Sequence, residues 1–283
     1  MAEALKERYP FVFDAIKVNL EAYGVKVETI NTTHNIWVRD YMPVQVGDHF
    51  VRFQYKTVGY EKYPQLKIDD TLWMGKLVPV IQSPIVLDGG NCVRGYGKAI
   101  ITSKVLKDNP EKTPMELLAE MERLLECQVI LIPIEPGDTL GHSDGICKFV
   151  DEKTMLINDY SSIYDKDSRF KRYTAKLHSI FSDAGFSVEI LPYAYGDWDW
   201  DMSEKEFRKR YPEADDFNPG FGYYINFLVA RSLILAPVMG IKKDTDVIKR
   251  LLQLYPQHSI VAINCKHLSM CGGLINCVTM NYT

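Results

Sequence analysis

The chain has 283 residues, of which 46% are hydrophobic and 25% are charged, a composition typical of a folded globular protein. Its formal net charge is −4 and it contains no basic block, which argues against nucleic acid as a partner and permits a cationic substrate. The N-terminal stretch carries charges throughout, and no apolar run is long enough to span a bilayer. We therefore expect a cytoplasmic protein with no membrane partner, whose six cysteines are reduced thiols.

Helix–strand segments and hairpins alternate along the sequence. Helical spacing of apolar residues predicts four helices, each followed by a strand, over 9–23, 113–126, 168–184 and 244–255. A fifth and weaker helix is predicted over 69–76, before a strand at 77–82. Period-two alternation around a turn predicts five hairpins, over 44–56, 85–102, 145–159, 223–238 and 272–282.

This alternation indicates an α/β array with a repeat of roughly 50–60 residues. The chain begins on a helix and strand and ends on a lone hairpin, so the simplest completion is a closed ring joined at the two termini. We therefore expect the last strand to be structural, and we expect removal of Met1 to Glu3 to change neither stability nor activity. One domain is predicted over residues 1–283.

A long insertion interrupts the pattern at residues 196–222. Its acidic and aromatic residues alternate in a way that suits the tail of an amine substrate: Asp197, Trp198, Asp199, Trp200 and Asp201. The alternative is a solvated loop with a short helix over 204–211.

Titratable side chains recur beside successive hairpins. Asp40 precedes the first, Asp88 opens the second, His142 and Asp144 open the third, and Cys277 lies in the fifth. In a ring of similar units, equivalent positions point toward one axis, so these side chains are expected to meet. A thiol, an imidazole and carboxylates supply a nucleophile, a proton carrier and ligands for a cation. Because His142 and Asp144 are two residues apart, both would face the same side of a strand.

Four motifs carry a resemblance to a known family. "WVRDYMP" (37–43), "LDGGN" (87–91), "GHSDG" (141–145) and "GGLINCVT" (272–279) resemble, in order and spacing, the signatures of the agmatine deiminases and the related bacterial peptidyl-arginine deiminases. The resemblance implies the pentein fold, a five-bladed α/β propeller. The chain departs from the family at its start, which lies after the Trp-Pro strand of the familiar agmatine deiminases. It departs again in the last motif, where Cys271 replaces a glycine and Asn276 stands before the cysteine.

The resemblance also implies a hydrolase that deiminates a small cationic guanidino substrate, agmatine first among them. It makes Cys277 the nucleophile, His142 the general acid and base, and Asp40 and Asp144 the guanidinium ligands. Attack of the thiol on the guanidinium carbon, loss of ammonia and hydrolysis of the thiouronium need neither a metal nor a cofactor. Further residues from the same motifs are expected to line the substrate site: Trp37, Asp88, Asn91 and Gly273.

Several alternatives stay open at this point. Cys277 could be a small buried hydrophobe, and Asp40 and Asp88 could serve only to form turns. A zinc site is the poorest alternative, because its four candidate ligands lack the usual spacing: Cys265, His267, Cys271 and Cys277.

Rival functions are a peptidyl-arginine deiminase, an amidinotransferase that passes the amidino group to an amine, and a non-catalytic guanidinium-binding protein. A free-arginine substrate would need a cation for its carboxylate, for which Arg39 and Arg94 lie near the motifs. The exact substrate and the oligomeric state stay open, and a homo-oligomer is compatible with the sequence.

Overall fold

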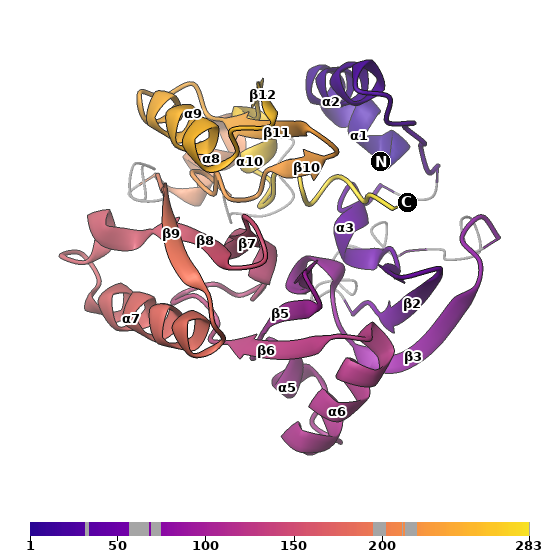
Figure 1. Ribbon diagram of the computed structural model, residues 1–283. Coiled ribbons are helices and arrows are strands. Elements are labelled where there is room, and N and C mark those ends of the chain that lie inside the picture. Colours follow the sequence, from indigo (N-terminus) through magenta and orange to yellow (C-terminus); the bar gives the residue numbers. More distant parts are fainter. Residues whose placement is uncertain are drawn as a thin grey trace. The chain divides into compact units, whose positions relative to one another are not determined.

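The computed structural model describes residues 1–31, 34–56, 68, 75–194, 202–210, 212 and 220–282 (Figure 1). The chain forms two compact units. Unit 1 comprises Met1–Val38 and Leu191–Asn281, and unit 2 comprises Arg39–Ile190 together with Tyr282. Within the described ranges, no helix has both the length and the apolarity that a membrane crossing requires.

Unit 2 is built on three sheets of one design, each an antiparallel hairpin followed by a third strand. In the first two sheets the third strand runs parallel to the second strand of the hairpin. The first sheet contains β1 (Val44–Val46), β2 (His49–Gln54) and β3 (Val80–Val86). The second contains β4 (Val93–Gly95), β5 (Lys98–Thr102) and β6 (Gln128–Ile132). The third contains β7 (Cys147–Phe149), β8 (Thr154–Asp159) and β9 (Ser187–Pro192).

Helices connect and cover these sheets. They are α3 (Val38–Tyr41), α5 (Lys104–Asp108), α6 (Pro114–Leu125) and α7 (Ser168–Asp183), with the 3-10 turns η2 (Gly89–Asn91), η3 (Ser143–Gly145) and η4 (Tyr160–Ile163). Helix α6 begins at a capping box in which Thr113 and Glu116 bond each other's backbone N–H groups, so its first turn is fixed by local sequence.

One face of α6 packs on the strands of the first two sheets. Leu117, Met121 and Leu125 on this face are fully buried, and they join Val51 and Ile101 in one apolar cluster. Figure 1 shows α6 alongside β6, at the same end of unit 2 as β3. Burial of such side chains stabilises the fold by about 1.5–3 kcal/mol each.

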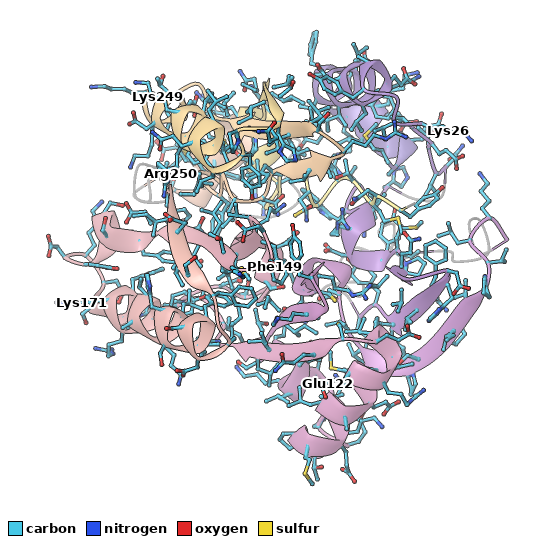
Figure 2. The ribbon with its side chains drawn as sticks, in the orientation of Figure 1. Lys26, Glu122, Phe149, Lys171, Lys249 and Arg250 are labelled. Carbon is cyan, nitrogen blue, oxygen red and sulfur yellow. The ribbon has the colours of Figure 1, made fainter. Side chains whose placement is uncertain are left out.

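The third sheet contributes a separate aromatic contact. Phe149 of β7 is buried and meets the rings of Tyr96 and Phe186 edge-on, with centroid separations of 5.9 and 5.7 Å. Figure 2 shows Phe149 in the interior, whereas Glu122 on α6 and Lys171 on α7 lie on the outside. Both helices are thus amphipathic, as expected, with charged residues on the outside and apolar residues on the buried face.

Unit 1 contains a fourth sheet of the same design, with β10 (Leu228–Ala230), β11 (Leu233–Val238) and β12 (Ser259–Asn264). Strand β12 pairs parallel with β11 and contacts two of the unit's helices. Those two helices are α2 (Pro10–Ala22) and α9 (Lys243–Leu254). The other helices of unit 1 are α1 (Glu3–Arg8), α8 (Glu204–Arg210) and α10 (Lys266–Ser269).

Most predicted elements are confirmed. The structure contains the first four hairpins, the helices predicted over 9–23, 113–126, 168–184 and 244–255, and the short helix predicted over 204–211. The strand predicted over 77–82 begins later, at Val80. The acidic and aromatic part of the insertion, and nearly all of the helix predicted over 69–76, lie outside the described residues.

The fifth hairpin, predicted over 272–282, is wrong. Residues around Cys277 form a turn in which the N–H of Val278 donates to the carbonyl of Leu274 at 3.3 Å. The N–H of Thr279 donates to the carbonyl of Asn276 at 3.2 Å. The β-branched composition favoured a strand, but these local hydrogen bonds and the tertiary contacts of the turn override that propensity.

The strand predicted to follow the helix over 9–23 is also absent from residues 25–30 except for one bridge, in which Ile30 pairs parallel with Ala2. The N–H of Ile30 donates to the carbonyl of Met1, and the N–H of Glu3 donates to the carbonyl of Ile30, both at 2.9 Å. Met1 and Ala2 are buried. Because of these contacts, we expect removal of Met1 to Glu3 to lower the free energy of unfolding, contrary to the expectation from the sequence alone.

Candidate active site

Unit 2 places two carboxylates on opposite sides of one imidazole. Nε2 of His142 lies 3.1 Å from Oδ2 of Asp88, and Nδ1 of the same ring lies 3.6 Å from Oδ1 of Asp40. Asp88 directly precedes η2, His142 directly precedes η3, and Asp40 belongs to α3. The side chains of these three residues are 8–12% exposed, so their charges act on one another through little water.

Two adjacent glycines make this approach possible. A Cβ on Gly90 would lie 2.5 Å from Oδ1 of Asp40 and 2.7 Å from Nδ1 of His142. A Cβ on Gly89 would overlap the carbonyl oxygen of Arg39. The N–H of Gly90 donates to Oδ1 of Asp40 at 3.1 Å, which holds that carboxylate in place. The "DGG" sequence is therefore required by the packing of α3 against η2.

Asp144 is the third carboxylate near the imidazole. It lies in η3, is 3% exposed, and acts electrostatically on both Asp40 and His142. The expectation that His142 and Asp144 share the face of a strand is wrong, because residues Ser143–Gly145 form a 3-10 turn. Both side chains nevertheless act electrostatically on Asp40.

The pKa values of Asp40, His142 and Asp88 are strongly perturbed. Burial raises the pKa of Asp40 to about 7; Asp144 and Asp88 add to this effect, while His142 opposes it. Burial alone would lower the pKa of His142, but Asp40, Asp88 and Asp144 overcome it and raise that pKa to about 10. Burial opposes ionisation of Asp88 too, yet its contacts with His142 and Lys104 hold its pKa below the usual value. These shifts favour a protonated imidazole at neutral pH and bring the ionisation of Asp40 close to it.

Asn91, one of the predicted substrate residues, makes a scaffold contact. It is 1% exposed, and its carboxamide oxygen accepts a hydrogen bond from the N–H of Thr102 at 2.8 Å. The hydroxyl of Thr102 donates to the carbonyl of Gly141 at 2.5 Å. Asn91 thereby links "LDGGN" through β5 to the residue that precedes His142.

Sequence analysis missed Lys104 as a member of this group. Its ammonium lies 3.1 Å from Oδ2 of Asp88 and 2.5 Å from Oδ2 of Asp108. The i, i+4 spacing of Lys104 and Asp108 is a signal in the sequence, whereas the contact with Asp88 depends on the fold. Oδ1 of Asp88 is buried and has no hydrogen-bond partner in the part of the chain that the structure describes.

Cys277 belongs to unit 1, where Asn226 holds the turn around it. Oδ1 of Asn226 accepts from the N–H groups of Asn276 and Cys277 at 3.1 and 3.3 Å, and from Sγ of Cys277 at 3.4 Å. The N–H of Asn276 also donates to the carbonyl of Asn226 at 3.1 Å. Asn226 is 3% exposed, and no sequence motif singled it out.

Trp37 and Gly273, two further predicted substrate residues, lie together in unit 1. A Cβ on Gly273 would lie 2.5 Å from the Trp37 ring, so the indole packs directly on the glycine backbone. Gly220 lies on the adjoining backbone, where its Cβ would be 3.1 Å from the carbonyl carbon of Gly272. The two glycines of "GGLINCVT" therefore serve close packing beside the turn that holds Cys277.

Other candidates from the sequence have structural partners. The guanidinium of Arg94 donates to the carbonyls of Gln45 and Leu125, so those N–H groups are directed at backbone. Sγ of Cys271 contacts Arg8 and Tyr9. Among the described residues, no three His, Cys, Asp or Glu side chains gather where they could hold a metal ion.

The fold belongs to the α/β pentein class. The structure matches the agmatine deiminase of Enterococcus faecalis with a TM-score of 0.71 at 17% identity, covering 98% of this chain and 87% of that one. It matches DDAH from Pseudomonas aeruginosa with a TM-score of 0.52 at 12% identity, covering 93% and 84% of the two chains.

Sequence comparison gives the family. The model of the Porphyromonas-type peptidyl-arginine deiminases matches residues 6–282, and the chain belongs to that family. The agmatine deiminase of Medicago truncatula is 29% identical over 218 residues, which cover 71% of this chain and 58% of the relative. The chain thus spans less than two thirds of that relative's length.

Proposed function

We propose that the chain is a hydrolase that deiminates agmatine to N-carbamoylputrescine and ammonia. The observation that carries the proposal is the group of three carboxylates around the imidazole of His142, two of them buried and that of Asp40 only 10% exposed. The motifs that supply these carboxylates are those that resemble the family, and "GGLINCVT" adds Cys277 to them. Membership of the Porphyromonas-type family and the agmatine deiminases among its relatives support the same reaction.

The carboxylates suit a guanidinium ligand. Asp40 and Asp144 are proposed to accept its N–H groups, since charge-assisted and bidentate hydrogen bonds hold a planar cation well in a dry site. Oδ1 of Asp88, buried and without a hydrogen-bond partner among the described residues, is a further acceptor of the right kind. Trp37 and Gly273 are proposed to line the substrate site, and Asn91 to contribute through its bond to Thr102.

In the proposed reaction the thiolate of Cys277 attacks the guanidinium carbon and forms a tetrahedral adduct. His142 donates a proton to the departing nitrogen, the C–N bond breaks and ammonia leaves. A thiouronium remains on Cys277. His142 then takes a proton from water and the hydroxide adds to the same carbon. The C–S bond breaks to release the thiolate, and the hydroxyl proton passes to solvent as the carbonyl of the ureido product forms. The reaction changes no oxidation state, so it needs no redox partner.

A second comparison supports the role of the cysteine. A structure of the Campylobacter jejuni agmatine deiminase in which a cysteine is replaced by serine holds bound substrate; it matches this chain with a TM-score of 0.65 at 16% identity, covering 93% and 78% of the two chains. A serine in place of a nucleophilic thiol allows binding while it slows attack, as the proposed mechanism requires.

The finer architecture is part of the proposal. Four three-stranded sheets of one design support a repeated unit, and the Ala2–Ile30 bridge supplies strand-like pairing for a fifth. We propose that these four sheets and the fifth repeat form a closed five-bladed propeller, and that residues 1–283 make one catalytic domain. A cytoplasmic location and a small guanidino substrate, without nucleic acid or membrane partners, complete the proposal.

Ammonia release from agmatine, arginine and an arginyl peptide, measured side by side, tests the function and separates its rivals. We expect agmatine to react fastest, and Cys277→Ala to bind agmatine without turnover. Preference for the peptide would make the chain a peptidyl-arginine deiminase. Amidine transfer to an added amine would indicate an amidinotransferase. Binding of agmatine without ammonia release by the unmodified protein would overturn the hydrolase in favour of a binding protein.

A further inference from the structure

The ammonium of Lys104 shares a carboxylate oxygen with the imidazole of His142. Oδ2 of Asp88 lies 3.1 Å from Nζ of Lys104 and 3.1 Å from Nε2 of His142. The side chain of Lys104 is 13% exposed, so its charge is poorly screened. Two cations therefore compete for one acceptor, and Lys104 acts on His142 without touching it.

The stem of Lys104 is fixed against the backbone that carries His142. Gly141 has a φ of +66°, and a Cβ there would lie 2.9 Å from Cδ of Lys104. The hydroxyl of Thr102 accepts from the N–H of Lys104 at 3.3 Å and donates to the carbonyl of Gly141 at 2.5 Å. The lysine is thus held at both ends, by packing at its stem and by carboxylates at its ammonium.

The charged groups that act on His142 and Lys104 come from four elements of unit 2. Asp40 comes from α3, Asp88 precedes η2, Asp144 comes from η3, and Asp108 lies with Lys104 on α5. Burial opposes the charge on Lys104, but Asp88 and Asp108 raise its pKa above the usual value. Lys104 is therefore a permanent cation beside the pair of Asp88 and His142.

We propose that Lys104 is a positioning residue, which fixes the carboxylate of Asp88 against His142 and limits how tightly the imidazole holds its proton. Without the ammonium, Asp88 would pair with His142 alone, and the imidazolium would be stabilised further. His142 would then give its proton less readily to the departing nitrogen when ammonia leaves. Only this last consequence rests on the proposed function; the electrostatic relationship does not.

Titration of the His142 ring by NMR, with histidine labelled by ¹³C and ¹⁵N, tests the relationship directly. The signal is assigned by its loss in His142→Gln. We expect Lys104→Met to shift the His142 titration to higher pH by on the order of one unit. Lys104→Arg, which keeps the charge, should restore most of the original value. Lys107→Met is the matched control, since Lys107 lies exposed on the same helix and should leave the titration unchanged.

Asp108→Asn gives a second test with the opposite sign. It removes the other partner of the ammonium, so Lys104 binds Asp88 more strongly and the His142 titration should move to lower pH. If Lys104→Met fails to fold, this variant tests whether Lys104 acts on His142 through Asp88. A folded Lys104→Met protein with the His142 titration of the unmodified protein, or an Asp108→Asn protein with no shift, would overturn the inference.

Kinetics separate this inference from the proposed function. For agmatine we expect Lys104→Met to lower kcat about tenfold with a smaller change in KM, and Lys104→Arg to recover most of the loss. If the unmodified protein releases no ammonia but the titration moves as expected, the proposed function fails and the role of Lys104 stands. If turnover occurs and the titration does not move, the role of Lys104 fails and the function stands.

Discussion

Oδ1 of Asp40 lies 3.6 Å from Nδ1 of His142, in a region where both side chains are nearly excluded from solvent. The carboxylate thus meets a cation on one side and, in the proposed complex, a guanidinium on the other. Because burial raises the pKa of Asp40 to about 7, this carboxylate changes charge near neutral pH, and binding of a cation should depend on pH there.

Agmatine affinity is therefore expected to rise as pH increases toward about 7 and to level off above it, because the cation binds the ionised form of Asp40. Asp40→Asn should weaken binding by roughly 10- to 100-fold and remove this dependence. Calorimetric Kd values across this range, measured with Cys277→Ala to prevent turnover, provide the test. An identical pH dependence in the proteins with and without Asp40 would show that another group controls binding.

Folding stability should also depend on pH through His142. Its pKa is about 10 in the folded protein and 6.5 for an unperturbed histidine, so the folded state binds the proton more tightly. The resulting stabilisation is complete below about pH 6.5 and is lost as pH rises toward 10. The free energies of unfolding of the unmodified protein and of His142→Gln, measured in urea, should therefore differ less and less as the pH rises over that interval. A difference that stays constant would contradict the ion-pair arrangement.

Gly90→Ala should damage the site by steric means. The new Cβ would lie within 2.7 Å of both Asp40 and His142, so the two side chains must separate. We expect a loss of about 1–3 kcal/mol in the free energy of unfolding and a fall in kcat/KM on the order of 100-fold. Gly75→Ala is the matched control, because a Cβ at Gly75 would meet no heavy atom of the described residues within 4 Å. Equal activity of the two variants would mean that the contact of Asp40 with His142 is not needed.

Asn226 should control the turn that presents Cys277. Asn226→Leu removes an oxygen that accepts from two N–H groups and the thiol, and should cost about 1–3 kcal/mol of stability and most of the activity. Asn226→Asp keeps an acceptor oxygen but places a negative charge beside the thiol, which should retain more stability yet slow alkylation of Cys277 by iodoacetamide. An Asn226→Leu protein with normal stability and turnover would show that the turn does not depend on this side chain.

The parts of the fold that were predictable depend on local pattern. Period-two alternation located the first four hairpins, and the helix at Pro114–Leu125 follows from its capping box and one apolar face. Within unit 2, motif positions identified Asp40, Asp88 and His142, which the structure brings together.

The residues that escaped prediction depend on contacts between distant segments. Lys104 follows a predicted strand and gains its role from Asp88, 16 residues earlier. Asn226 lay within a predicted hairpin, and its contacts are with residues about 50 positions later. The turn at Cys277 was predicted as a strand because its β-branched residues favour strands. That preference depends on pairing with a neighbouring strand, and the tertiary contacts of this segment form a turn instead.

The most direct test of the proposed mechanism is the mass of the protein quenched in acid during turnover of agmatine. We expect a species heavier than the unmodified chain by the mass of agmatine less that of ammonia, mapped by peptide sequencing to Cys277 and absent from Cys277→Ala. Turnover with the adduct on another residue, or ammonia release by a folded Cys277→Ala protein, would contradict a thiouronium on Cys277.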